Sequence, residues 1–130
     1  MFIALNPSTA DETVDDPTIR RCIRFAFDWG YSGVYMVNLF GFRATDPKEM
    51  KAQGDPFGAD NHDWLVKTAE ASKLAVACWG VNGSYVTAGK ITKAMLERFD
   101  IELYHLGLTK DGHPRHPLYL KLDTVPVRWI

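Results

Sequence analysis

The sequence predicts a three-layer α/β/α sandwich, in which helices cover both faces of a four-stranded, mostly parallel sheet. Four short apolar runs, typical of strands buried on both faces, alternate with segments that have helical periodicity. Strands joined by helix-length crossovers pair in parallel, and the crossover helices then cover the sheet. A chain of 130 residues is most simply one domain, so we expect a single α/β domain over residues 1–130.

The first half of the chain supplies two strands and one helix. The wholly apolar run Met1–Leu5 predicts the first strand, and Val34–Phe40 predicts the second. Between them, Asp16-Pro17 is typical of an N-cap and a first helical position, and Gly30 ends the helix. Apolar residues at helical spacing predict its buried stripe: Ile19, Cys22, Ile23, Ala26 and Phe27.

The second half repeats the alternation after a long loop over residues 41–58, which has one candidate helical turn at Pro47–Lys51. Asp60 is a candidate N-cap for a helix that runs to about Ser72, with Asn61, Trp64, Leu65 and Thr68 along one side. The third strand is expected at Leu74–Trp79 and the fourth at Ile101–Leu106. The helix between them is expected at Tyr85–Phe99, with Ile91, Met95 and Leu96 facing inward. A further short strand is a candidate near Val125–Trp129.

Composition excludes several classes of protein. The net charge is −1, so nucleic-acid binding would have to rest on a local patch. Cys22 and Cys78 lie in apolar runs without ligand spacing, which predicts two buried thiols in a reducing cytoplasm and no iron–sulfur cofactor. No apolar run approaches the roughly 20 residues of a membrane span, so no membrane partner is expected.

Polar and glycine-rich loops lie at one edge of the predicted sheet. In open parallel sheets, ligands bind beyond the carboxyl ends of the strands. Four loops that are polar or rich in glycine leave those ends: 6–9, 41–45, 80–84 and 108–120. The loops at the opposite edge look like plain turns, which places the expected site at the carboxyl edge.

The histidine loop, Leu108–Leu120, is the most distinctive of the four. His113 and His116 each precede a proline, which stiffens their backbone, and Asp111-Gly112 supplies a turn before them. Lys110 and Arg115 add positive charge, so the loop fits an anionic or proton-accepting ligand. A third metal ligand at characteristic spacing is missing, so no metal site and no cofactor are expected.

Several segments resemble the domain-of-unknown-function 1643 family of bacteria and phages. They are Leu5-Asn6-Pro7-Ser8-Thr9-Ala10-Asp11, Asp16-Pro17-Thr18-Ile19-Arg20-Arg21, Asn38-Leu39-Phe40, Arg43-Ala44-Thr45-Asp46-Pro47 and the histidine loop. The resemblance covers nearly the whole chain. Members of this family usually carry an extra segment before the first strand.

A more distant resemblance is to the uracil-DNA glycosylase superfamily, which has a four-stranded parallel sheet in a three-layer sandwich. Ala4-Leu5-Asn6-Pro7 is similar to its motif after strand one, with alanine in place of glycine. His113-Pro114-Arg115-His116-Pro117-Leu118 is similar to its motif after strand four, with one residue more, so either histidine can occupy the motif position. The resemblance implies that Asn6 positions water, that one histidine contacts the departing base, and that Leu118 fills the vacated stack.

Each candidate has a structural alternative. Asn6 can orient water through its carbonyl oxygen or simply form an Asn-Pro turn, and Asp11 is the best candidate for a general base. His116 is preferred to His113 as the donor to the leaving base, although either ring could only hold the loop. Trp79 could stack on a base or pack in the core. The expected substrate contacts are Pro7, Ser8, Thr9, Phe42, Arg43, Trp79, Asn82, Lys110, Arg115 and Leu118.

The sequence therefore leads us to expect a cytoplasmic hydrolase of uracil-DNA glycosylase type. Its substrate would be an N-glycosidic bond in DNA or in a free nucleotide. The alternative is a non-catalytic module that binds a nucleobase or nucleotide in the same pocket. An unrelated hydrolase on the same frame is a third option, because a fold alone does not determine a reaction.

Overall fold

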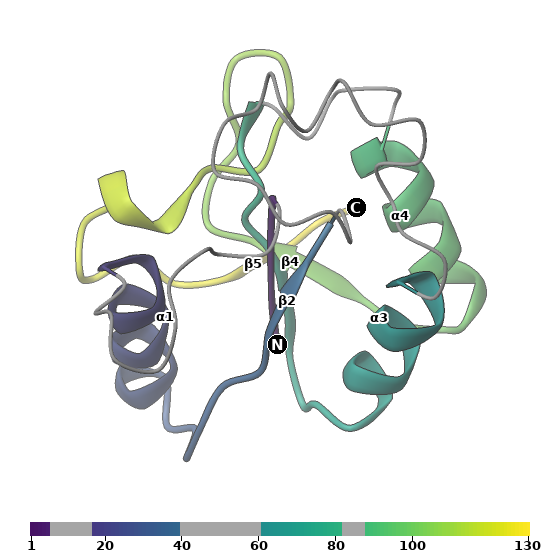
Figure 1. The fold of residues 1–130 in the computed structure, drawn as a ribbon. Helices are drawn as coiled ribbons and strands as arrows, with labels where there is room; N and C mark the ends of the chain where they lie inside the picture. The colour runs from purple at the N-terminus through teal and green to yellow at the C-terminus, as the bar shows by residue number, and fades with distance from the viewer. Residues whose placement is uncertain (6–16, 40–60, 82–87) are drawn as a thin grey trace.

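The structure is a computed structural model, and it describes residues 1–5, 17–39, 61–81 and 88–130. Its centre is a mixed sheet with the strand order β2-β1-β3-β4-β5 (Figure 1). The strands are β1 (Phe2–Ala4), β2 (Met36–Asn38), β3 (Ala75–Ala77), β4 (Leu103–His105) and β5 (Val127–Arg128). The first four pair in parallel, which confirms the predicted crossovers and the interior position of β1.

The expected strand count is wrong by one, because five strands pair among the described residues. β5 runs antiparallel to β4 and lies at the position of the candidate short strand near Val125–Trp129. Trp129 N donates a 2.8 Å hydrogen bond to Leu103 O. The tail thereby pairs with an edge of β4 that would otherwise expose unpaired backbone groups.

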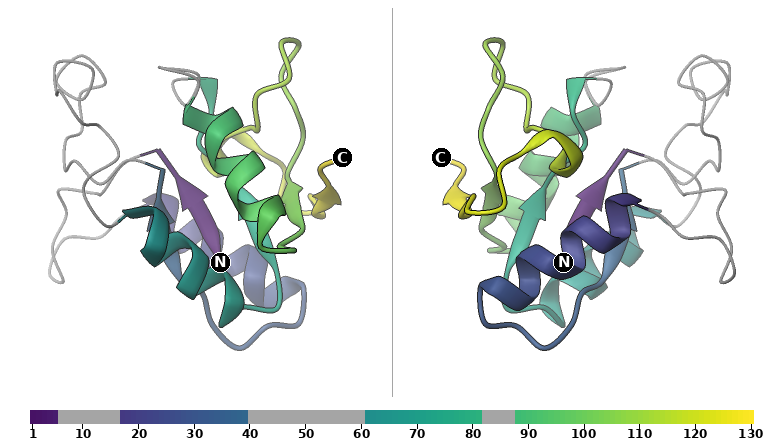
Figure 2. Two further views of the ribbon diagram at one scale, coloured as in Figure 1. Left: turned by 90° about the vertical axis from the view of Figure 1, so that its right-hand side faces the viewer. Right: turned by 90° about the vertical axis from the view of Figure 1, so that its left-hand side faces the viewer.

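The predicted three layers are present. In the described part of the chain, α1 (Pro17–Asp28) covers one face of the sheet, and α3 (Asn61–Glu70) and α4 (Ala88–Arg98) cover the other (Figure 2). Side chains alternate between the faces as a pleated strand requires. Phe2 and Val76 pack in one cluster with Phe25 of α1. Ile3 and Ala77 pack in the other cluster with Leu65 and Leu96 of the opposite helices.

The buried face of α1 differs from the predicted stripe. Cys22 and Ala26 are buried as expected, but Ile23 is 50% exposed and Phe27 is 76% exposed. Phe25, which the stripe left outside, is fully buried. Its ring stacks on Trp29 at 5.4 Å, and Trp29 in turn stacks on Phe2 of β1 at 5.9 Å. The helix is therefore rotated so that its aromatic pair faces the sheet.

Both ends of α1 agree with the sequence. Pro17 is its first residue, as predicted, and its last is Asp28. Gly30 has φ +91°, and Tyr31 N donates a 2.9 Å hydrogen bond to Ala26 O beyond the helix end. A left-handed glycine that closes such a bond is a common way to end a helix.

The buried faces of α3 and α4 also differ from the predicted faces at single positions. Leu65 and Thr68 of α3 are buried as predicted, whereas Trp64 is exposed. In α4, Leu96 is buried and Met95 half-buried, but Ile91 is exposed and Thr92 takes its place in the core. The predicted N-cap Asp60, the turn at 47–51 and the start of the last helix at 85–87 lie outside the described residues.

The predicted burial of the two thiols is confirmed, since Cys22 and Cys78 are both free and fully buried. A side-chain hydrogen bond with Cys22, together with burial, raises the pKa of the Cys78 thiol well above its ordinary value of 9.0. Cys78 Sγ also lies 3.4 Å from Ile3 O, to which it donates. The pair therefore ties α1 to the sheet.

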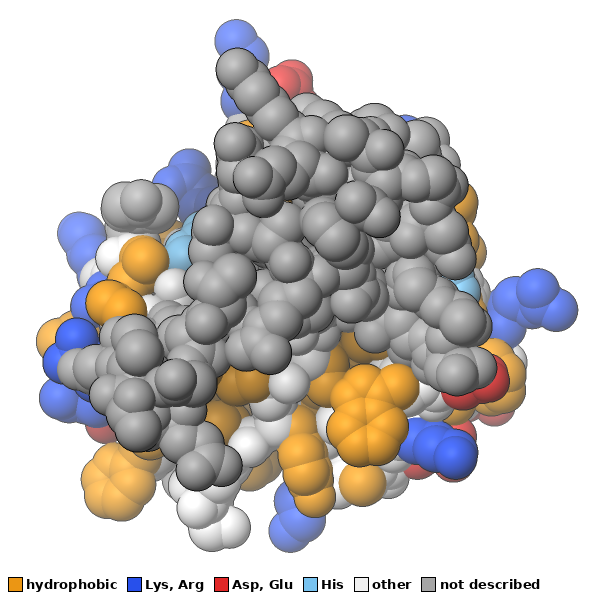
Figure 3. Space-filling model, in the orientation of Figure 1, with side chains coloured by type: hydrophobic (Ala, Val, Ile, Leu, Met, Phe, Trp, Pro, Cys, Tyr) orange, Lys and Arg blue, Asp and Glu red, His pale blue; other side chains and the backbone are white. Residues whose placement is uncertain are grey.

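No helix in the described part of the chain is long and apolar enough to cross a membrane. On the face shown in Figure 3, described lysine and arginine side chains are spread around the margin of the molecule.

Candidate functional site

The candidate site is the edge of the sheet where the parallel strands end. The structure describes two of its four loops in whole or in part: the start of the loop after β3 and all of the histidine loop after β4. The rest of the predicted site lies outside the described residues: Asn6, Pro7, Ser8, Thr9, Asp11, Phe42, Arg43 and Asn82. The placed candidates are Trp79, Lys110, His113, Arg115, His116 and Leu118.

The first half of the histidine loop is a tight hairpin. Leu108 and Pro114 form an antiparallel bridge, and Thr109 N donates a 2.8 Å hydrogen bond to His113 O. Gly112 N closes the turn on Thr109 O at 2.9 Å, and Gly112 has φ +83°. The predicted Asp111-Gly112 turn is therefore confirmed, and it places His113 at the base of the hairpin.

The second half of the loop docks onto the end of β3. Pro114 and Pro117 are among the fully buried side chains, and Pro114 O accepts a 2.9 Å hydrogen bond from Gly80 N. Gly80 has φ +73°, and a Cβ atom there would lie 4.0 Å from the Cβ atom of His116. The loops that follow β3 and β4 therefore meet at Gly80 and His116, as the predicted topology requires.

His116 has a defined orientation. It is the N-cap of the short 3₁₀ helix η2 (Pro117–Tyr119), and its Nδ1 atom accepts a 3.2 Å hydrogen bond from Leu118 N. A neutral ring that accepts at Nδ1 carries its proton on Nε2, which makes Nε2 a donor. His113 differs, because its backbone nitrogen donates a 3.1 Å hydrogen bond to Thr109 Oγ1 and fixes the hairpin. The two histidines thus have distinct positions.

The two cations of the loop are exposed. Arg115 folds over Gly107, which has φ +114°, so closely that a Cβ atom at Gly107 would lie 3.2 Å from Arg115 Cδ. Arg115 N donates a 3.0 Å hydrogen bond to Gly107 O. Lys110 sits at the turn of the hairpin, and Leu118 is at the exposed surface beside His116. Lys110 and Arg115 therefore give the loop exposed positive charge and hydrogen-bond donors.

Trp79 lies in the core. It is 3% exposed, and its ring lies 5.8 Å from the ring of Trp129 at an angle of 49°. A Cβ atom at Gly89 of α4 would be only 2.8 Å from Trp79 Nε1, so the ring fills the space that this glycine leaves. This packing favours the core alternative for Trp79 and does not support stacking on a base.

Sequence reasoning gave no role to His105, the last residue of β4. His105 Nδ1 accepts a 3.0 Å hydrogen bond from Gly107 N, and its ring meets Trp129 edge-on at 6.2 Å. Burial lowers the pKa of His105 below its ordinary value of 6.5. A neutral His105 therefore holds the start of the histidine loop. The sequence signal for this role was the position of a histidine two residues before Gly107.

Among the described residues, no three histidine, cysteine, aspartate or glutamate side chains gather into a group that could hold a metal ion.

Comparison with known proteins gives one match. No curated protein and no solved structure matches the sequence. The sequence model of one family, described as protein of unknown function (DUF1643), matches residues 1–118, which is most of the chain. The protein therefore belongs to the DUF1643 family.

Proposed function

We propose that this protein is a nucleobase-recognising hydrolase of uracil-DNA glycosylase type. Its substrate would be an N-glycosidic bond in DNA or in a nucleotide. The observation that carries the proposal is the fixed ring of His116, which caps η2 through Nδ1 next to the end of β3. The mostly parallel sheet with helices on both faces supports it, because it is the class of fold that the resemblance implies.

The chemistry would be as follows. Water attacks C1′ of the sugar while the C1′–N bond breaks, and the electron pair of that bond leaves with the base. The departing base is an anion, and His116 Nε2–H would donate a hydrogen bond to it. Asn6 would orient the water, and Asp11 would accept its proton, which finally returns to the base. Lys110 and Arg115 would stabilise the negative charge, and Leu118 would fill the space that the base leaves.

A non-catalytic nucleobase-binding module is the second candidate, and one observation favours it. Of the charged side chains in the histidine loop, Lys110 and Arg115 are positive, and the one carboxylate, Asp111, is exposed in the hairpin turn. Such a set can recognise a base and a phosphate group, but it does not activate water. The two functions differ in whether free base is released.

Release of free base from normal, deaminated and modified oligonucleotides and nucleotides tests the proposal. His116→Ser is the informative variant, since a serine can still cap η2 but cannot reach a base as imidazole does. We expect a loss of roughly 2–4 kcal/mol of transition-state stabilisation, a value typical for removal of one oxyanion donor. Asn6→Ala should lower turnover and leave the affinity for the base largely intact.

The matched control is His113→Ser in the same loop, and it should retain base release. Wild-type release that neither Asn6→Ala nor His116→Ser slows would show that the site is misplaced. If no substrate releases base and both variants lower affinity, the binding module is correct.

A further inference from the structure

The side chain of Arg21 on α1 has a hydrogen-bond donor that the described residues do not use. Its guanidinium carbon lies 5.4 Å from the centre of the Phe25 ring, one turn further along the helix. Arg21 Nε is buried and has no hydrogen-bond partner among the described residues. Arg24 on the same helix differs, since its Nε pairs with Asp28 at 3.0 Å.

The Phe25 ring does not replace the missing acceptor of Arg21. An aromatic ring attracts the face of a guanidinium group, whereas the N–H donors lie in the guanidinium plane and need oxygen acceptors. A buried donor without an acceptor costs free energy, and a charged one costs more than a neutral one. An anion bound at the guanidinium would supply both an acceptor and negative charge.

Arg21 lies on the part of α1 that is next to η2. The segment after η2 runs along α1, because Leu120 packs against the cluster that contains Phe25, and Trp29 Nε1 donates a 3.1 Å hydrogen bond to Thr124 O. Arg21 precedes Phe25 by one turn, so the same register brings it opposite η2, which precedes Leu120. The helices α1 and η2 are in contact, and they lie side by side in Figures 1 and 2.

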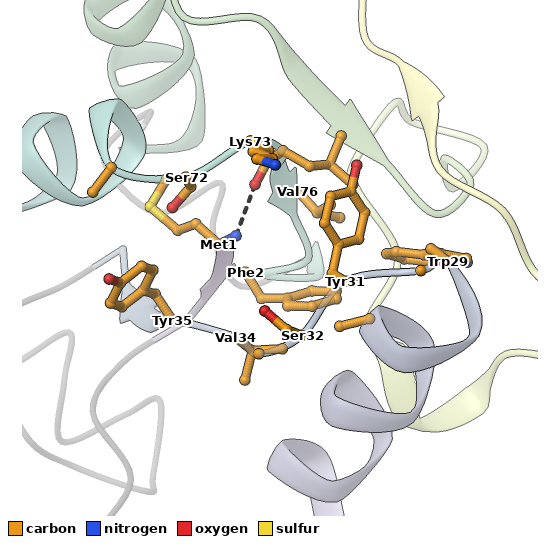
Figure 4. Close-up of a pocket in the computed structure, with 15 residues that line it drawn as sticks. Met1, Phe2, Trp29, Tyr31, Ser32, Val34, Tyr35, Ser72, Lys73 and Val76 are labelled. Carbon is orange, nitrogen blue, oxygen red and sulfur yellow. Dashed lines mark hydrogen bonds between the residues drawn. The ribbon is translucent and has the colours of Figure 1, made fainter.

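The far end of α1 is anchored on the sheet, which fixes the height of Arg21 beside η2. Figure 4 shows this end, where Trp29 and Phe2 line a cavity of about 570 Å³. Trp29 stacks between Phe2 and Phe25, and Phe2 is 3% exposed, so the rings cover one another. A helix held in this way presents its arginine in a constant place.

Further positive charge surrounds η2. Arg115 and Lys121 precede and follow this short helix and are both exposed, and the helix itself contains no carboxylate. Several of the lysine and arginine side chains visible in Figure 3 lie along its left side, where Figure 1 shows α1 and η2. Positive charge of this kind attracts an anion to the surface beside Arg21.

We propose that Arg21 binds a phosphate group of the nucleotide whose base His116 contacts. The oxygens of a phosphate group match the planar donors of a guanidinium. His116 caps η2, and Arg21 lies beside the same short helix, so the base and the phosphate bind next to one another. The proposal rests on the proposed function for the identity of the ligand, since both candidate functions there take a nucleotide or nucleic acid.

The test compares two fluorescently labelled single-stranded octanucleotides of random sequence. One has ordinary phosphodiesters, and the other has neutral methylphosphonates at every linkage. In fluorescence anisotropy at low salt, Arg21→Gln should weaken binding of the phosphodiester about tenfold and leave binding of the methylphosphonate unchanged. Arg24→Gln is the matched control and should bind as wild type, because the charge of Arg24 is already paired with Asp28.

Two further measurements keep the test independent of how Arg21→Gln folds. Arg21→Met removes the charge but keeps an unbranched apolar chain over Phe25, so it should show the same tenfold loss. In amide ¹H–¹⁵N spectra of the wild type, the phosphodiester should shift the signals of residues 20–25, and the methylphosphonate should not.

Several results would overturn the phosphate site. They are wild-type binding of the phosphodiester by a folded Arg21 variant, an equal loss in Arg24→Gln, an equal loss for the methylphosphonate, or no binding of the phosphodiester to the wild type. Base release is measured separately. If no substrate releases base while phosphodiester binding depends on Arg21, the phosphate site is correct and the hydrolase activity is not.

Discussion

The imidazole of His116 has a structural role as well as the proposed chemical one. Its Nδ1 atom satisfies Leu118 N at the start of η2, and the flanking Pro114 and Pro117 are buried. Any substitution that removes the cap will loosen the loop and lower activity whatever the reaction is. For this reason a cap-retaining residue separates chemistry from folding better than alanine does.

The buried thiol of Cys78 predicts how the free energy of unfolding depends on pH. The side-chain hydrogen bond with Cys22 and burial raise its pKa above the ordinary value of 9.0 in the folded protein. Above about pH 9 the unfolded chain loses this proton while the folded chain keeps it, so the free energy of unfolding falls as pH rises. Below pH 9 both states hold the proton, and the stabilisation is fully present.

The measurement is urea unfolding of wild type and Cys78→Ala between pH 7 and pH 10.5. The wild type should lose stability above pH 9 faster than the variant, so the gap between the two curves should narrow. Other groups titrate in the same range, and Cys78→Ala retains all of them except the thiol. Parallel curves across the whole range would show that the folded Cys78 has an ordinary pKa.

At the scale of the elements, the buried face of α1 gives a sharp test. Phe25→Ala removes a fully buried ring that stacks on Trp29, and we expect a loss of roughly 3–5 kcal/mol in the free energy of unfolding. Phe27→Ala makes the same chemical change at a side chain that is 76% exposed, so we expect a change within about 0.5 kcal/mol. Urea unfolding of both variants checks this. Equal losses would mean that Phe27 is also buried.

The same helix shows how far sequence can predict structure here. Two stripes have helical spacing around α1: Ile19, Cys22, Ile23, Ala26 and Phe27, and alternatively Cys22, Phe25, Ala26 and Trp29, the last of which lies one residue beyond the end of the helix. Periodicity alone does not choose between them. The ring of Phe2, which comes from another element, decides for the second stripe. The four apolar runs carried no such ambiguity, and their parallel direction was predictable from the crossovers.

For the candidate site, too, local rules were predictable from the sequence, whereas contacts between distant residues were not. Its position at the carboxyl edge and the turn at Gly112 came from topology and turn chemistry, which are local or general rules. The bond between Gly80 N and Pro114 O and the burial of Trp79 against Gly89 depend on tertiary packing between distant residues. The roles of His105 and Trp129 were missed for this reason.

At the scale of the whole molecule, charge sets what kind of nucleic-acid contact is compatible with the protein. The net charge is −1, and the described lysines and arginines visible in Figure 3 lie around the margin of the molecule, several of them along its left side. Binding of an oligonucleotide would then depend on a few local cations. Of those expected from the sequence, Lys110 and Arg115 are exposed on the histidine loop, and Arg43 lies outside the described residues.

These few contacts predict a weak dependence of binding on salt. For a single-stranded oligonucleotide, the slope of log K against log salt should be roughly −2 to −3, because each neutralised phosphate contributes about −0.7 to −0.9. Lys110→Gln should reduce that slope by roughly one contact's share, whereas Lys90→Gln on the exposed surface of α4 should leave it unchanged. Fluorescence anisotropy with a labelled oligonucleotide at several salt concentrations measures the slope. A slope near −8 would require a large basic surface, and such a surface would have to involve residues outside the histidine loop.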